Sequence, residues 1–293
     1  MSNGAQPNLP KFLVIGAAKS GTTTLATYLR KHPECFIPEE KEPNFFGIDE
    51  KYEQGLDYYA ALFEPAAENQ HCAEASTDYA KWPRYPHVAE RIAQHLPDVK
   101  LIYLMRHPVE RAYSYYVHRH RSGVDETFEE YIARTSEAID GSNYMMQIER
   151  YMPFFSKERF LFLLSEDLVS DPYETLRSVC RFIGVDDTFD FSADGPVAAN
   201  RGRKVFEDTL RGRVTAPLRR VPLLATVAAA MPQSWRDGFY ALLKKTAYGK
   251  QVRQTYTAPP MKPETRQELL EYFSKPNENL AKFIGQDLSS WSS

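Results

Sequence analysis

A glycine-rich loop between a buried strand and a helix constrains the fold of this chain more than any other feature of its sequence. Residues 11–16 (KFLVIG) form a short apolar run that ends in glycine, which is typical of a buried strand. Residues 21–32 have a helical pattern that Pro33 stops. In the loop between them, successive backbone N–H groups and the helix N-terminus can face one anion. We therefore expect a phosphate-binding site directly after the first strand.

Strand and helix patterns alternate along the remainder of the chain. This alternation predicts a three-layer α/β/α fold, in which helices cover both faces of a central, mainly parallel sheet. With 293 residues, the chain suits one large domain over 11–293, preceded by a flexible tail at 1–10. Strands are predicted at 70–75, 99–105 and 159–164, and helices at 84–96, from Pro108 onward, and at 125–138, 143–153, 171–184, 263–274 and 277–288.

Charge and hydropathy exclude several classes of protein. The formal net charge is −3, so the chain is not a general binder of polyanions such as nucleic acids, and an anion site must come from local placement of charge. The longest apolar stretch, 221–231, is too short to span a bilayer, and the polar N-terminus has no signal-peptide core. Three cysteines are too few for a disulfide framework. We expect a cytoplasmic protein without a transmembrane segment.

The position of the lysine in the glycine-rich loop separates it from the nucleotide-binding P-loop. Gly16 and Gly21 have the spacing of G-x-x-x-x-G-K-[ST], but Thr22 stands where that motif has its lysine. In P-loop enzymes this lysine reaches the β/γ-phosphates, and the next residue holds Mg²⁺. Here Lys19 lies inside the loop instead. The loop therefore predicts a grip on one phosphate, with Lys19 placed to neutralise a leaving group and no metal site.

Four sequence blocks, in order, resemble the sulfotransferases that use 3′-phosphoadenosine 5′-phosphosulfate (PAPS). The resemblance covers residues 11–205 and is closest to the heparan-sulfate-type and bacterial branch, which implies the sulfotransferase version of the P-loop-like fold. The segment 205–262 matches nothing specific, and we expect it to form an acceptor groove or a helical insertion. The blocks are KSGTTTL at 19–25, KEPNFF at 41–46, LMRHPVERAYS at 104–114 and RGRK at 201–204.

The resemblance implies a site for PAPS as donor and for 3′-phosphoadenosine 5′-phosphate (PAP) as product, without a required metal. A planar guanidinium fork from Arg106 and the Ser114 hydroxyl suit the 3′-phosphate. Arg201, Gly202 and Arg203 match the basic loop that closes over the nucleotide. The 5′-phosphosulfate side is assigned to the first loop, namely Lys19, Ser20, Gly21, Thr22, Thr23 and Thr24.

Sulfuryl transfer needs a base for the acceptor and stabilisation of charge on the leaving phosphate, in an in-line arrangement. Glu42 matches the family's catalytic glutamate and is the predicted base, although some branches of the superfamily use a histidine instead. Lys19 is the second predicted catalytic residue, because its ammonium faces the leaving group in this resemblance. The predicted reaction is in-line transfer to a hydroxyl or an amine.

The acceptor is a small molecule or a carbohydrate in this resemblance. The segment EASTDY at 74–79 is similar to the family's E-K-[ST]-P-x-Y, with Ala75 in place of the heparan-type lysine. This departure weakens the case for a heparan acceptor. Glu74 and Asp78 are predicted to contact the acceptor or to support Lys19, and His118 and Tyr144 are further candidates for the acceptor site.

Two other functions remain open from the sequence. A P-loop phosphotransferase keeps the first loop, but it must explain Thr22 in the lysine position. A non-enzymatic anion or nucleic-acid binder can use the basic interval 201–220, which holds seven basic and two acidic residues. The negative net charge and the separated phosphate motifs argue against this binder, and we expect no nucleic-acid partner.

Overall fold

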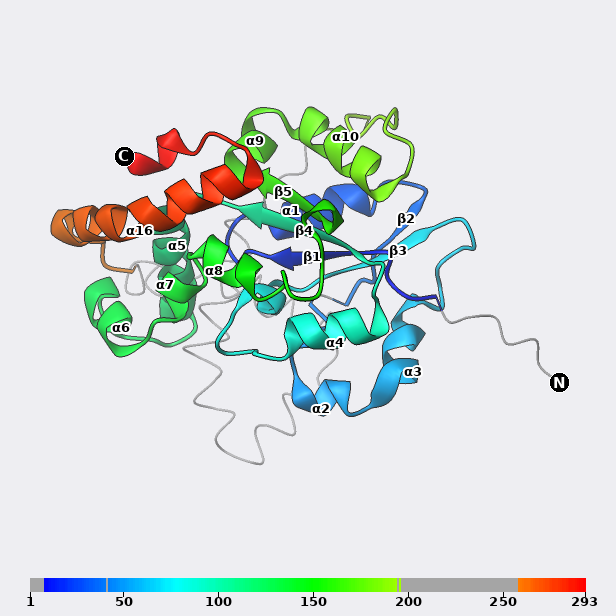
Figure 1. The fold of residues 1–293 in the computed structure, drawn as a ribbon, viewed down its shortest axis with the longest axis horizontal. Helices are drawn as coiled ribbons and strands as arrows, with labels where there is room; N and C mark the ends of the chain where they lie inside the picture. The colour runs from blue at the N-terminus through cyan, green and yellow to red at the C-terminus, as the bar shows by residue number, and fades with distance from the viewer. Residues whose placement is uncertain (1–7, 41, 194, 196–257) are drawn as a thin grey trace, which may run out of the picture. The chain divides into compact units, whose positions relative to one another are not determined.

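A parallel sheet of five strands forms the centre of the fold (Figure 1). The computed structural model describes residues 8–40, 42–193, 195 and 258–293. The strand order is β2-β3-β1-β4-β5, and every neighbouring pair is parallel. The strands are β1 (Phe12–Gly16), β2 (Cys35–Phe36), β3 (His71–Ala75), β4 (Lys100–Met105) and β5 (Phe160–Leu164).

Continuous apolar runs make the central strands, as expected for strands that are buried on both faces. Every residue of β1 is buried. Successive side chains alternate between the two faces of a strand. Phe12 and Val14 accordingly belong to one hydrophobic cluster, whereas Leu13 and Ile15 belong to the other. The register places Val14 between Ala75 of β3 and Ile102 of β4.

Helices cover both faces of the sheet, which confirms the predicted three-layer α/β/α architecture (Figure 1). The first face packs against α1 (Thr22–Leu29), α9 (Ser165–Ser170) and α10 (Pro172–Ile183). The second face packs against α4 (Val88–His95), α8 (Tyr144–Glu149) and, through Leu280, α16 (Pro263–Ile284).

The described residues fall into two compact units. The first contains residues 8–112, 136–195 and 266–293, and it includes the whole sheet. The second contains residues 113–135 and 258–265.

The remaining helices of the described residues are α2 (Asp49–Tyr52), α3 (Gly55–Ala60), α5 (Pro108–Arg121), α6 (Phe128–Arg134) and α7 (Glu137–Asp140). Short 3₁₀ turns are η1 (Ala61–Phe63), η2 (Thr77–Ala80), η3 (Lys157–Arg159) and η5 (Ser289–Ser292).

Aromatic packing holds the described part of the second unit together. Tyr116 contacts the rings of Phe128 and Tyr131, at centroid distances of 5.4 and 5.8 Å. Helix α6 begins with a capping box, in which Thr127 and Glu130 satisfy each other's backbone N–H groups. The Tyr113 hydroxyl donates to the Pro259 carbonyl at 2.9 Å. These contacts join the end of α5 to α6 and to the segment before α16.

The structure confirms the predicted ends of one helix and corrects the predicted end of another. For α10, Asp171 accepts from Glu174 N–H, and Gly184 ends the helix at φ 83°, as the sequence predicts. The predicted break between 263–274 and 277–288 is wrong, because α16 continues through Pro276. Phe273 and Leu280 are both buried on one face of that helix, two turns apart, and their burial outweighs the backbone hydrogen bond that Pro276 removes.

Candidate active site

The two predicted phosphate-binding blocks follow neighbouring strands at one edge of the sheet. From β1 the chain leads to β2 on one side, and from β4 it leads to β5 on the other. In open α/β sheets, such a reversal of direction creates a crevice outside the carboxyl ends of the strands, where ligands bind. The loop after β1 contains Lys19, and Arg106 follows β4 directly. The Ala17 N–H donates to the Leu104 carbonyl at 2.7 Å and joins the two segments.

The loop after β1 has a backbone that presents N–H groups at the start of α1. Lys19 lies in the left-handed region at φ 75°, and Gly21, the N-cap of α1, has a φ of 105°. A glycine cap has no side chain to accept from the first helical N–H groups, which have no partner within the helix. Those of Thr22 and Thr23 are therefore placed for an anion. At Gly16 a Cβ atom would lie 3.0 Å from the Tyr103 ring, so the backbone approach requires glycine.

The side chains of this loop differ in exposure. Lys19 and Thr24 are half-buried, and Thr23 is exposed. Ser20 and Thr22 are buried, with 1% and 6% of their surface exposed. Ser20 is enclosed, and its N–H donates to the Ala17 carbonyl at 3.1 Å. The loop is therefore better suited to bind an anion through backbone N–H groups and the Lys19 ammonium than through a row of hydroxyl groups.

A buried arginine on α5, for which the sequence predicts no role, holds this loop. Arg111 is only 1% exposed, and its Nε donates to the Ala18 carbonyl at 2.9 Å. Its Nη1 donates to the Ala138 carbonyl at 2.9 Å and to Ser142 Oγ at 3.3 Å. A Cβ atom at Gly141 would lie 2.7 Å from this guanidinium. Arg111 belongs to the third sequence block, and its place in that block is the sequence signal that points to a role at the site.

Arg106 is held by its backbone, which leaves its guanidinium at the surface of the crevice. The Tyr144 hydroxyl donates to the Arg106 carbonyl at 2.6 Å and accepts from the Arg106 N–H at 3.3 Å. Burial raises the pKa of Tyr144 to about 12, so its hydroxyl keeps its proton. The guanidinium is half-buried and lies 3.9 Å from Glu110, which also pairs with Arg266 at 2.6 Å. Tyr144, a predicted acceptor residue, thus lies beneath Arg106 with 1% of its surface exposed.

Other predicted residues belong to the second compact unit, to η2 or to segments that the structure does not describe. Ser114 and His118 are half-buried on α5, one turn apart, in the second compact unit. Arg201, Gly202 and Arg203 lie outside the described residues, as does most of the segment 205–262. Asp78 lies in η2, where it forms an ion pair with Lys81 at 2.5 Å. Their predicted roles toward the nucleotide and the acceptor stay predictions.

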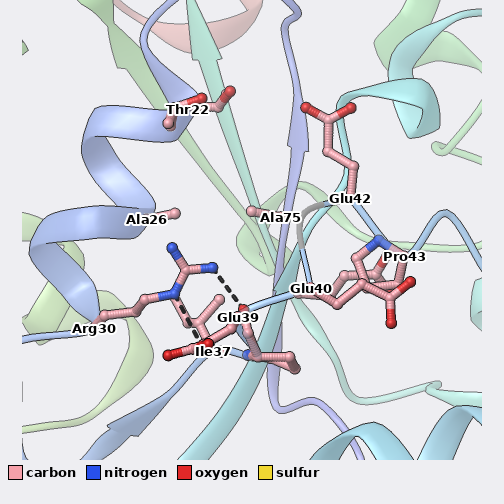
Figure 2. A pocket seen from close by; sticks show the side chains of 12 residues that line it. Thr22, Ala26, Arg30, Ile37, Glu39, Glu40, Glu42, Pro43 and Ala75 are labelled. Atoms are coloured by element: carbon pink, nitrogen blue, oxygen red, sulfur yellow. Dashed lines mark hydrogen bonds between the residues drawn. The ribbon is translucent and has the colours of Figure 1, made fainter. Parts of the chain in front are cut away.

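Glu42 lines a pocket of about 220 Å³ between α1, the loop after β2 and the end of β3. The backbone of Glu42 is left-handed, at φ 55°, and its side chain is half-buried. Figure 2 shows Glu42 and Thr22 at one end of this pocket and Arg30 at the other. The Arg30 guanidinium donates to the carbonyls of Ile37 and Pro38, at 3.2 and 2.6 Å. The other lining residues are Thr23, Ala26, Glu39, Glu40, Pro43, Glu74 and Ala75.

The Glu74 carboxylate, at the end of β3, is enclosed by hydrogen-bond donors. It accepts from Tyr59 OH at 2.5 Å, from Tyr79 OH at 2.8 Å and from Asn44 N–H at 3.0 Å, and also from Ser76 Oγ. Burial raises the pKa of Glu74, and these four donors act in the opposite direction. Glu74 is 1% exposed, so it borders the pocket from within the core.

Within the described residues, no group of three or more His, Cys, Asp or Glu side chains is arranged to hold a metal ion. No helix in the described part of the chain is both long and apolar enough to cross a membrane.

Comparison with known proteins identifies the family. The sulfotransferase domain family matches residues 9–209, which is more than half of the chain, so the chain belongs to this family of enzymes. The structure of a sulfotransferase from Alicyclobacillus acidocaldarius superimposes with a TM-score of 0.67 and 26% identity, over 97% of this chain and 99% of that one. The resemblance predicted from the four sequence blocks is thereby confirmed.

Curated relatives include heparan sulfate enzymes. The bifunctional heparan sulfate N-deacetylase/N-sulfotransferase 4 of Mus musculus is 27% identical over 97% of this chain and 31% of its own length. The heparan sulfate glucosamine 3-O-sulfotransferase 3B1 of Homo sapiens is 32% identical over 63% of this chain and 48% of its own length. The chain thus spans between about a third and a half of these relatives.

Proposed function

We propose that this protein transfers a sulfuryl group from PAPS to a hydroxyl or an amine of a small-molecule or carbohydrate acceptor and releases PAP. One observation carries the proposal: the Lys19 loop and Arg106 follow neighbouring strands at the point where the sheet reverses direction. PAPS carries a 5′-phosphosulfate and a 3′-phosphate on one ribose, so it requires two separate anion sites. Membership of the sulfotransferase family supports the same reaction.

The residues of the crevice suit such a donor. The N–H groups at the start of α1, together with the Lys19 ammonium, provide positive charge for the 5′-phosphosulfate. The Arg106 guanidinium, half-buried and fixed through its backbone, provides a planar fork for the 3′-phosphate. The two sites are joined through Ala17 and Leu104, so their spacing is set by the sheet and not by a mobile connection.

In the proposed mechanism, Glu42 removes the proton of the acceptor hydroxyl or amine as the acceptor atom attacks sulfur. The new bond to sulfur forms as the bond between sulfur and the bridging phosphate oxygen breaks, and that oxygen keeps the electron pair. Lys19 and the N–H groups of the loop stabilise the charge that develops on the leaving phosphate. Glu42 therefore ends the step protonated, and PAP leaves with the additional negative charge. This division of roles gives Glu42 to the acceptor and Lys19 to the donor.

Titration with PAP separates this proposal from the phosphotransferase alternative. We expect PAP to bind with the same affinity in EDTA and in Mg²⁺, because Lys19, Arg106 and the N–H groups of α1 supply the positive charge in the proposed site. A P-loop phosphotransferase would instead bind ATP with Mg²⁺ and hydrolyse it. Calorimetry with PAP and with Mg²⁺–ATP distinguishes the two, and an absence of PAP binding contradicts the proposal.

The lining of the pocket informs the choice of acceptor. Ala75 lines the pocket at the position of the heparan-type lysine, and Glu39 is an exposed acidic residue that lines the same pocket at the end near Arg30 (Figure 2). Such a pocket repels polyanions. We therefore propose that an unsulfated, amine-bearing carbohydrate is a better acceptor than a sulfated one. Transfer of ³⁵S from labelled PAPS to an unsulfated glucosamine tetrasaccharide, compared with its sulfated counterpart, tests this preference.

A further inference from the structure

We propose that Glu74 is a positioning residue for Glu42, and that it acts by fixing the loop that carries Glu42. This inference rests on the proposed sulfuryl transfer. It replaces the predicted contact between Glu74 and the acceptor with an indirect role. The geometry that supports it is the set of hydrogen bonds and ring contacts between Glu74, its neighbours and residues 44–46.

The loop after β2 needs support from outside itself. Glu42 and Asn44 both have a φ of 55°, in the left-handed region that residues other than glycine rarely adopt. Such conformations are unfavourable and persist only where the surrounding structure enforces them. Glu42 belongs to no helix or strand that could fix its orientation. The way in which the following residues are held therefore contributes to the direction of its carboxylate.

Glu74 and its hydroxyl partners hold those residues directly. The Asn44 N–H donates to Glu74 Oε1 and to Ser76 Oγ, both at 3.0 Å. The Phe46 N–H donates to the Tyr79 hydroxyl at 3.2 Å, and that hydroxyl donates to Glu74.

The aromatic partner of Glu74 completes the support. The Phe45 ring stacks on the ring of Tyr59 at a centroid distance of 4.5 Å, and the Tyr59 hydroxyl also donates to Glu74. The carboxylate of Glu74 is thus the common acceptor of a network that reaches each of residues 44–46.

A direct contact between Glu74 and the acceptor fits this arrangement poorly. The four donors already use both carboxylate oxygens. The residue is also only 1% exposed. A positioning role uses all four contacts, whereas an acceptor contact would have to displace at least one of them.

A double-mutant cycle with Glu42 tests the proposal. Glu74→Gln keeps the size of the side chain but replaces one acceptor oxygen with a donor nitrogen. Turnover is followed as ³⁵S leaving labelled PAPS, either to an unsulfated glucosamine tetrasaccharide or to water. We expect kcat to fall by roughly 10- to 100-fold, because a small misplacement of a catalytic group has effects of this size. PAP affinity, measured by calorimetry, stays unchanged, as does the activity of the matched control Glu50→Gln on exposed α2.

The cycle separates a positioning role from a merely structural one. In a Glu42→Gln background, Glu74→Gln should have no further effect, because the residue through which it acts is already disabled. Multiplied losses in the double variant would overturn the inference. A raised KM for the tetrasaccharide with an unchanged kcat would overturn it as well, since it would show an acceptor contact.

A second pair of variants decides the question if Glu74→Gln does not fold. Ser76→Ala and Tyr79→Phe each remove one hydroxyl from the network, and the same cycle with Glu42→Gln applies to them. If the wild-type protein binds no PAP and moves no label, the proposed function fails and this inference fails with it. If the wild-type protein is active and the losses multiply, only the role of Glu74 is refuted.

Discussion

The loops that carry Lys19 and Glu42 both contain a residue with a left-handed backbone, but buried side chains of opposite charge hold them in place. Both residues have left-handed backbones, at φ 75° and 55°. The Lys19 loop is held by a buried cation, because Arg111 donates to the Ala18 carbonyl. The Glu42 loop is held by a buried carboxylate, because Glu74 accepts from the Asn44 N–H. Each loop is thus held through its backbone by a buried side chain of another element.

The two loops differ in the structure that each would keep without its buried partner, Arg111 for the Lys19 loop and Glu74 for the Glu42 loop. The Lys19 loop leads into α1, whose first N–H groups form an anion site wherever the helix begins. The Glu42 loop does not pass directly into a helix, since α2 begins only at Asp49, and its geometry depends on side chains of β3, η2 and α3. We therefore expect substitutions around the Lys19 loop to disturb the donor site less than substitutions around the Glu42 loop disturb the base.

Removing the carboxylate of Glu42 should have the largest effect on catalysis. General-base catalysis contributes roughly 10²- to 10⁴-fold, so Glu42→Gln should lower kcat by a factor in this range. PAP binding should stay unchanged, because the donor site lies on the other loop. Transfer of label from ³⁵S-PAPS and calorimetry with PAP measure the two quantities. Equal kcat in the variant and the wild type would assign the base to another residue.

Removing Arg111 should have the largest effect on stability. Arg111→Met leaves the Ala18 carbonyl without its Arg111 donor, at roughly 1–3 kcal/mol, whereas the Ala138 carbonyl still accepts from Ser142 Oγ. We also expect weaker binding of PAP, because the Lys19 loop loses its anchor. Urea unfolding gives the free-energy change. The same substitution at exposed Arg177, whose ion pair with Glu174 spans 3.5 Å, should change stability by less than about 1 kcal/mol.

Lys19→Ala and Arg106→Ala should each weaken PAP binding by about tenfold or more, since each removes a cation from a phosphate site. Neither substitution should lower the free energy of unfolding by as much as it lowers the free energy of PAP binding, because both side chains are only half-buried. Lys275→Ala, on the exposed face of α16, is the matched control. If only one of the two variants loses affinity, the ligand engages one phosphate site and the two-site account is wrong.

The two anchors should differ in their response to pH. Arg111 keeps its charge at all accessible pH values, whereas burial raises the pKa of Glu74 above 4.5. A carboxyl group with a raised folded-state pKa stabilises the fold most at low pH, and that stabilisation is lost as pH rises through the folded pKa. The unfolding free energy of the wild type, relative to Glu74→Gln, should therefore decrease as pH rises above 4.5. An increase would mean that the four donors outweigh burial.

The sequence predicts the features that depend on local patterns, and it misses those that depend on contacts between distant residues. The Lys19 loop, the buried strands and the caps of α10 are local patterns, and the structure has them where the sequence indicates. Strand β2 has only two residues and gives no periodicity to detect. The roles of Arg111 and Glu74 depend on contacts such as Arg111 with Ala18, which lie 93 positions apart, and no local pattern encodes such contacts. A single domain and a cytoplasmic location stay predictions.

A crystal structure with PAP tests the central claim most directly. The account predicts the 5′-phosphate at the N-terminus of α1 beside Lys19, and the 3′-phosphate on the Arg106 guanidinium. The Glu42 carboxylate should then face the side of the 5′-phosphate from which an acceptor approaches. PAP bound away from the carboxyl ends of β1 and β4, or with its 3′-phosphate out of reach of Arg106, would contradict the account.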